Sequence, residues 1–114
     1  MRIRFTANTD LSRMKGLMFQ EALSEDECAL FEFPRCGKHG FWNNNVDFPI
    51  SLIFCDEDKK VVAVKGLDAQ QKSVVYPDSY NIKYVVEAHV DAPQKLTIQN
   101  GSIMNDDGKE VMFK

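Results

Sequence analysis

The amino-acid sequence predicts a mostly β domain, an antiparallel sandwich or flattened barrel with one short N-terminal helix. Two observations support this prediction. Short runs of β-branched and aromatic residues recur along the chain after residue 27, and such runs are typical of strands. The segments between them are short and rich in Asn, Asp, Gly and Pro, which tolerate tight turns. Strands joined in this way pair antiparallel, because a parallel pair needs a crossover of about a dozen residues.

Seven segments are expected to form strands, and each is bounded by turn-forming residues. They are residues 28–33, 50–55, 61–65, 73–76, 83–88, 95–99 and 111–113. Residues 50–54 and 61–64 are apolar at almost every position. We therefore expect these two runs to form the central strands, with both of their faces covered.

One amphipathic helix is predicted near the N-terminus. Asp10 is expected to cap it, and apolar residues follow at spacings of three and four, as one helix face requires: Leu11, Met14, Leu17, Met18 and Ala22. Gly16 inside this segment costs about 1 kcal/mol relative to Ala, so packing against the sheet has to stabilise the helix. Ser24 and Glu27 fit a capping box for one further turn.

The composition is that of a single globular domain, residues 1–114. Hydrophobic residues make up 44% of the chain and charged residues 27%, which is too apolar for a disordered protein. The formal net charge is -3, so no positive excess attracts nucleic acid or anionic lipid. No run approaches the roughly 20 apolar residues of a membrane helix. We expect a soluble protein with neither nucleic acid nor a membrane as its partner.

The cysteines and the N-terminus indicate a cytoplasmic location. Cys28, Cys36 and Cys55 form an odd set in a domain large enough to fold without disulfides, which favours a reducing compartment. Residues 1–6 lack the apolar run of a secretory signal.

Two stretches of the chain are similar to a known family. The first is Arg-Met-Lys-Gly-Leu-Met-Phe-Gln at residues 13–20, and the second is Phe-Trp-Asn-Asn-Asn at residues 41–45, followed by Pro49 and Ile50. Further on, Tyr-Val-Val-Glu at residues 84–87 looks like the family's Tyr-Val-Leu-Glu. This ordered series resembles the domain of unknown function 192, an uncharacterised ancient conserved region of bacteria and archaea, over about residues 3–104.

The resemblance implies a mostly β domain with no established activity, and relatives are often exported behind a signal sequence. The sequence departs from the family pattern at several positions. Asn43 stands where the family has Met, Val46 where it has Thr, and Ser51 where it has Asp. Any role that relatives give to these positions does not carry over directly.

Residues 41–47 are the strongest candidate for a binding site, because an indole and a phenyl ring adjoin three amides and a carboxylate. Rings offer flat apolar faces and amides both donate and accept, a mixture that suits polyhydroxylated ligands such as sugars. We expect Trp42 to stack on the ligand, Asn43 and Asn45 to exchange hydrogen bonds with it, and Asp47 to accept from its hydroxyls. The alternative is structural, with the rings in the core and Asn45 setting a turn.

Arg13 and Glu87 extend this candidate site. Both match positions that are charged in the family although they flank apolar segments. Either they form a mutual ion pair, or they provide the polar floor of a pocket.

The sequence thus favours a non-catalytic binding module for a small polar or carbohydrate-like ligand. One alternative is a hydrolase that uses Cys36 and His39, or a carboxylate pair of Asp47 and Glu87. Another is a structural protein that forms a homo-oligomer through its apolar strands. We expect no cofactor and no metal, because Cys36 and His39 have no second paired motif to complete a site.

Overall fold

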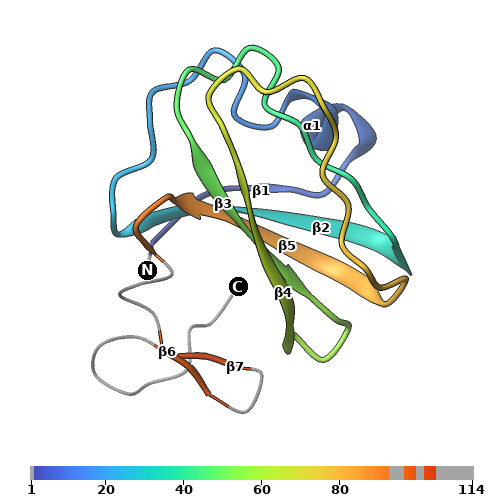
Figure 1. The fold of residues 1–114 in the computed structure, drawn as a ribbon. Helices are drawn as coiled ribbons and strands as arrows, with labels where there is room; N and C mark the ends of the chain where they lie inside the picture. The colour runs from blue at the N-terminus through green and yellow to red at the C-terminus, as the bar shows by residue number, and fades with distance from the viewer. Residues whose placement is uncertain (1, 93–96, 100–101, 105–114) are drawn as a thin grey trace.

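Five strands form one open sheet in the order β1-β2-β5-β3-β4 (Figure 1). This computed structural model describes residues 2–92, 97–99 and 102–104. Along the chain the strands are β1 (Arg2–Ala7), β2 (Glu27–Gly37), β3 (Ile50–Cys55), β4 (Val61–Leu67) and β5 (Ile82–His89), and a separate two-stranded sheet follows, β6 (Thr97–Gln99) and β7 (Ser102–Met104). The predicted mostly β class is confirmed, and the five-stranded sheet does not close into a barrel.

The strand pairs of the described residues are antiparallel with one exception. β1 runs parallel to β2, whereas β2–β5, β3–β5, β3–β4 and β6–β7 are antiparallel. Residues 8–26 connect β1 to β2 and include the helix α1 (Asp10–Lys15), so the parallel pair has the long crossover that it needs. The sequence did not predict β1, and this parallel pair is therefore a correction to the antiparallel expectation.

The helix α1 begins at a reciprocal cap and ends at a glycine. The Thr9 hydroxyl accepts from the Ser12 backbone N–H at 3.1 Å, and the Ser12 hydroxyl accepts from the Thr9 N–H at 2.9 Å. This pair satisfies two N-terminal donors. Gly16 follows the helix with φ at 47°, a left-handed value that favours glycine. A Cβ at this position would also lie 3.3 Å from the Phe31 ring.

The predicted helix was too long, and its apolar face was assigned wrongly. Leu11 and Met14 are 74% and 71% exposed, while Leu17 is buried after the helix has ended. Gly16 stops the helix after six residues, so the spacing of the later apolar residues does not define a helical face. Of the capping box predicted for Ser24 and Glu27, the Ser24 N–H does donate to the Glu27 carboxylate, but the Glu27 N–H donates to the Ser24 carbonyl oxygen, and the turn leads into β2 rather than into a helix.

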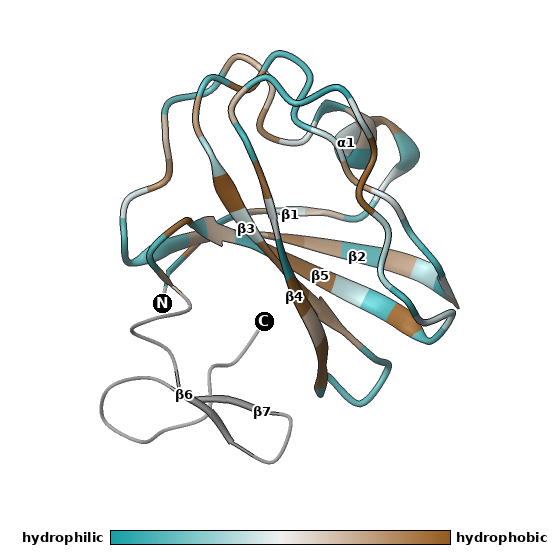
Figure 2. Ribbon diagram, viewed as in Figure 1, coloured by the Kyte–Doolittle hydropathy of each residue, from teal (hydrophilic) through white to brown (hydrophobic). Residues whose placement is uncertain are grey.

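The strand predicted at residues 50–55 is confirmed, and every residue of β3 is buried between β5 and β4. The central position predicted for residues 61–64 is wrong, because β4 lies at the sheet edge. Val62 and Val64 are 42% and 40% exposed. Figure 2 shows the hydrophobic residues along the middle strands of the sheet.

The remaining strand predictions have mixed outcomes. Residues 28–33 and 83–88 lie within β2 and β5. Residues 73–76 form no strand; they contribute a single antiparallel bridge between Phe41 and Val75. Residues 97–99 form β6, whereas residues 95–96 and 111–113 lie outside the described residues.

The two faces of the sheet carry separate apolar clusters. Leu30, Ile53 and Val86 belong to one cluster. Phe31, Leu52 and Val85 belong to the other, together with loop residues that include Leu17, Phe41 and Val46. The segment around α1 and the loops before β3 and β5 cover this second face, which carries the candidate site. The described residues contain no helix whose length and apolar character would let it cross a membrane.

Candidate functional site

A pocket of about 400 Å³ opens between α1, the strand β2 and the loop before β3. Half of its lining residues are apolar or aromatic: Met14, Leu17, Met18, Phe31, Phe33, Phe41, Trp42 and Val46. Four of the six predicted site residues also line it, namely Arg13, Trp42, Asn43 and Glu87. This volume falls in the range of small-molecule sites, which are usually apolar clefts with a few polar groups.

Glu87 provides a carboxyl group in the middle of the sheet. It lies on β5 opposite Ala29 of β2 and Leu52 of β3, and it is only 4% exposed. Within residues 2–92, no hydrogen bond or ion pair to its carboxyl group is found. Burial disfavours the charged form and raises the pKa of Glu87 to about 8. The side chain is therefore predominantly protonated at neutral pH.

Asn43 contributes a second buried polar group. Its side-chain N–H groups donate to the carbonyl oxygens of Phe48 at 2.9 Å and Asp68 at 3.0 Å. These bonds fix the orientation of the amide, because a flipped oxygen would face two other oxygens. The Asn43 Oδ1 atom is buried without a hydrogen-bond partner. It is an acceptor that the fold of the described residues leaves unused.

The Arg13 guanidinium is held in the wall of the pocket. It donates to Asp10 Oδ1 at 2.7 Å and to the Glu32 carbonyl oxygen at 2.8 Å. Its central carbon lies 5.3 Å from the centroid of the Phe33 ring, a distance typical of a cation–π contact. Arg13 thus already has two acceptors, one of which is a neutralising carboxylate. The mutual ion pair with Glu87 that the sequence allowed does not form.

Trp42 forms part of the rim. It is 46% exposed and lines both the main pocket and a smaller neighbouring hollow. Gly40, two residues earlier, lies so close to the opposite loop that a Cβ would come within 2.6 Å of the Val74 and Tyr76 side chains. The glycine therefore lets the backbone before Trp42 pass close to that loop.

Asn45 and Asp47 are exposed and are not part of the pocket lining. The Asn45 backbone N–H donates to Gln70 Oε1 at 3.2 Å, and Asp47 Oδ1 accepts from Gln70 Nε2. Both residues connect their loop to residue 70. Asn45 has φ at 60°, a left-handed conformation that asparagine tolerates.

The groups named for the hydrolase alternative do not gather in the pocket. Cys36 is exposed, and His39 stacks on Phe33 at 3.6 Å with its Nε2 atom 3.0 Å from the Arg35 carbonyl oxygen. Of the proposed carboxylate pair, only Glu87 lines the pocket.

The other two cysteines are buried in the opposite face of the sheet. Burial raises the pKa of Cys28 to about 11 and that of Cys55 to about 12. Both are therefore protonated thiols at neutral pH and poor nucleophiles.

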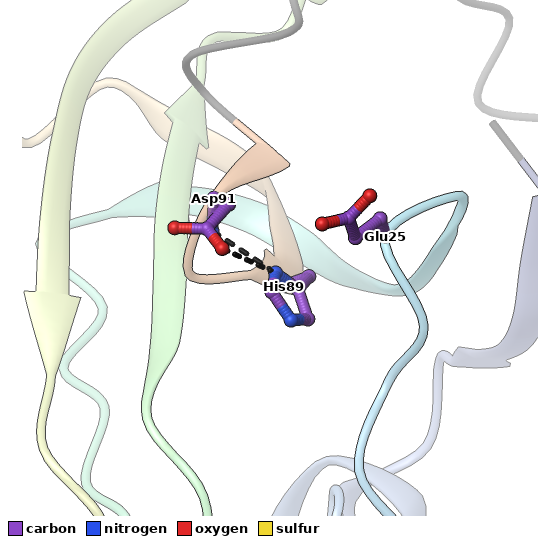
Figure 3. Close-up of side chains that lie close together, drawn as sticks. All are labelled: Glu25, His89 and Asp91. Carbon is purple, nitrogen blue, oxygen red and sulfur yellow. Dashed lines mark hydrogen bonds and ion pairs between the residues drawn. The ribbon is translucent and has the colours of Figure 1, made fainter.

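A surface cluster that the sequence did not predict lies near the start of β2 and the end of β5. The ligand atoms of Glu25, His89 and Asp91 all lie within 4.8 Å of one another (Figure 3). One imidazole and two carboxylates are a donor set that zinc accepts. However, His89 Nδ1 already accepts from the Asp91 backbone N–H at 3.0 Å. The cluster also lies at the surface, and no other feature of the described residues around it indicates a bound ion.

The apolar lining from β2 was also not predicted as part of the site. Phe31 and Phe33 are two residues apart on this strand, and both line the pocket. Alternation along a strand places such residues on one face. That signal was present in the sequence, but it shows a shared face and not a pocket.

The protein is thus a small β domain with an open sheet. One face of the sheet carries a pocket, and the buried residue Glu87 is part of its lining. Residues 2–105 match the model of the family DUF192, described as "Uncharacterized ACR". The chain belongs to this family, as its motifs indicated.

Two solved structures share the fold. A protein of unknown function from Novosphingobium aromaticivorans has a TM-score of 0.73 and 23% identity, over 81% of this chain and 67% of its own. A protein from Sinorhizobium meliloti, described as a candidate transcription regulator, has a TM-score of 0.76 and 20% identity, over 87% of this chain and 76% of its own. A search of curated proteins finds no match to the chain.

Proposed function

We propose that this domain binds a small polar ligand with an apolar part in the pocket lined by Trp42 and Glu87, without transforming it. The single observation that carries the proposal is the buried Glu87 carboxyl group, which has no partner within residues 2–92. Burying a polar group without a hydrogen bond destabilises a protein. A ligand that bonds to this group would compensate for part of that cost.

The rest of the lining fits the same role. Asn43 adds a second polar residue to the lining, and the aromatic wall offers apolar contact area. A carbohydrate-like ligand meets these requirements through its hydroxyl donors and the C–H face of its ring. Other small molecules with a donor group and an apolar part meet them as well.

The lining favours binding over hydrolysis. General acid–base hydrolysis needs a second titratable group poised beside the first. The other lining carboxylate, Asp10, is paired with Arg13, and the lining contains neither a cysteine nor a histidine. Glu87 is therefore better suited to hold a ligand than to act as one member of a catalytic pair.

The single tryptophan of the chain provides the test. A library of monosaccharides, polyols, amines and carboxylates is titrated into the protein while Trp42 fluorescence is followed. Because Trp42 lines the pocket, a bound ligand is expected to change its emission saturably. Specific binding also raises the thermal midpoint by mass action.

Calorimetry on variants then tests whether the ligand binds in this pocket. Trp42→Ala is expected to weaken binding at least tenfold while the protein still melts cooperatively. The control Tyr80→Ala, at a 73% exposed residue outside the lining, is expected to leave the affinity unchanged. The proposal would be overturned if no compound of the library binds, or if neither Trp42→Ala nor Glu87→Gln changes the affinity of the ligand that does.

A further inference from the structure

We infer that the ligand carries a positively charged amino group, which binds at the Glu87 carboxylate. This inference rests on the proposed function and names the chemical class of the ligand. It depends on which groups at the pocket are free to bond and on which are already engaged.

The two most deeply buried polar groups of the pocket are complementary to a donor. Asn43 is 1% exposed and Glu87 is 4% exposed. Both Asn43 N–H groups are engaged by backbone carbonyls, so this residue has no free side-chain donor for a ligand. An ionised Glu87 is likewise an acceptor only. An ammonium group has three donors and no acceptor, and it matches the acceptor-only Glu87 carboxylate.

The remaining charged residues of the lining all come from α1, and they are Asp10, Arg13 and Lys15. Arg13 is neutralised by Asp10 and also bonds to the Glu32 carbonyl oxygen. Lys15 is exposed, so solvent and salt screen its charge. The lining residues from β2 and from the loop before β3 are uncharged. Thus no unpaired buried cation competes with a ligand's ammonium group for Glu87.

The aromatic lining adds a second source of attraction. Phe31, Phe41 and Trp42 line the pocket, and aromatic ring faces attract cations that lie within about 6 Å of the ring centroid. The apolar part of the ligand packs on the same rings. A compact aromatic amine such as benzylamine combines both features, and it fits a volume of about 400 Å³.

Binding of such a cation is coupled to release of a proton. Burial holds the pKa of Glu87 at about 8 in the empty pocket, so at lower pH the carboxyl group is protonated. The ligand enters as an ammonium ion, the Glu87 proton leaves to solvent, and an ammonium–carboxylate pair remains. With that pKa the ionised fraction, and hence the affinity, rises about 50-fold between pH 6 and pH 8.

The experiment compares three probes of similar size: benzylamine, benzyl alcohol and benzoate. Their affinities for the intact protein are measured by calorimetry at pH 6 and pH 8, in buffers of different ionisation enthalpy. We expect benzylamine to bind most tightly, to gain about 50-fold in affinity over this pH range, and to release close to one proton at pH 6.

Two variants assign the effect to Glu87. Glu87→Gln keeps the side-chain volume but removes the charge, so benzylamine is expected to bind at least tenfold more weakly at pH 8 and without pH dependence. The matched control Glu57→Gln, at an exposed residue outside the lining, is expected to retain the full pH dependence.

The outcomes separate this inference from the proposed function. If benzyl alcohol binds as tightly as benzylamine, or if benzoate binds most tightly, the pocket binds ligands but the cationic class is wrong. If benzylamine does not bind at pH 8, the cationic class is also wrong, and the wider library then decides whether the pocket is a binding site at all.

Discussion

Two glutamates on neighbouring strands, Glu27 and Glu87, differ in whether the fold supplies hydrogen-bond partners for their carboxyl groups. Glu27, at the start of β2, accepts from Arg4 Nη2 at 2.9 Å and from Arg4 Nε at 3.2 Å, and also from the Ser24 backbone N–H at 3.1 Å. The Arg4 hydrogen bond is the main cause that lowers the pKa of Glu27 to about 2. Glu87, on β5, has no such partner in the described chain, and burial raises its pKa to about 8.

The difference separates a structural carboxylate from the one that we propose to bind a ligand. The Arg4 guanidinium also donates to the carbonyl oxygens of Glu21 and Ala22, so Glu27 and Arg4 tie β1 to the segment before β2. Glu87 ties no segment to another. It lines a pocket instead. The presence or absence of built-in partners therefore indicates the role of each residue.

The largest expected effect on stability comes from Glu87→Gln. The folded chain keeps the Glu87 proton up to a pH of about 8, whereas the unfolded chain releases it near the ordinary pKa of 4.5. The free energy of unfolding of the native protein therefore falls as pH rises through this window, by about 1.4 kcal/mol per pH unit. Glu87→Gln does not undergo this loss. Its free energy of unfolding is therefore expected to rise relative to that of the native protein by about 3 kcal/mol between pH 4.5 and pH 7.

Urea unfolding at the two pH values measures this change. The exposed variant Glu57→Gln is the control and should follow the native protein at both. Parallel pH dependence of the native protein and Glu87→Gln would mean that Glu87 is ionised in the fold, and the contrast between the two glutamates would be lost.

Asn43→Ala tests the other polar group of the pocket floor. The substitution removes two hydrogen bonds and leaves the carbonyl oxygens of Phe48 and Asp68 without this donor. We expect the free energy of unfolding to fall by about 2 kcal/mol. Asn44→Ala, at the half-buried neighbour that also lines the pocket, should stay within about 0.5 kcal/mol. Equal losses in both variants would show that the Asn43 bonds do not stabilise the fold.

Glu27→Gln tests whether the paired carboxylate stabilises the fold. Of the three substitutions, it should have the smallest effect on stability. The ionised Glu27 stabilises the fold above its unfolded pKa of 4.5, and this contribution is lost as pH falls towards about 2. We expect Glu27→Gln to lower the thermal midpoint modestly at pH 6, since ion pairs close to solvent contribute little.

At pH 2 the midpoints of Glu27→Gln and the native protein should converge. The control is Glu21→Gln, because Arg4 contacts only the backbone of that residue. A difference that stays constant from pH 6 to pH 2 would contradict the assignment of Glu27 as an ionised structural partner.

The sequence predicted the interior strands better than the periphery. Nearly continuous apolar residues located β3 to the residue, because a strand buried on both faces carries such a run. The run that became β4 looks similar, yet it lies at the edge, and composition alone does not show which neighbour a strand has. The short N-terminal helix was predicted too long because Gly16 ends it, at a left-handed φ of 47° that the sequence alone does not reveal.

Only part of the candidate site was predicted, because tertiary contacts between distant segments of the chain assemble it. Arg13, Trp42, Asn43 and Glu87 come together because β2 and β5 are paired and the loop before β3 covers them. Asn45 lies two residues from Asn43, but its left-handed backbone belongs to a turn bonded to residue 70. Such a tertiary contact leaves no local signal in the sequence, so neighbouring asparagines could not be told apart.

The decisive quantity is the pKa of Glu87 in the folded protein. A pH titration by NMR of protein with ¹³C-labelled glutamate follows each carboxyl signal, and Glu87→Gln assigns the one that belongs to Glu87. Because Glu87 is buried, we expect a signal that titrates near pH 8 and is missing from the variant. A Glu87 signal that titrates close to the ordinary value of 4.5 would contradict it, because the carboxyl group would then have a partner or be solvated.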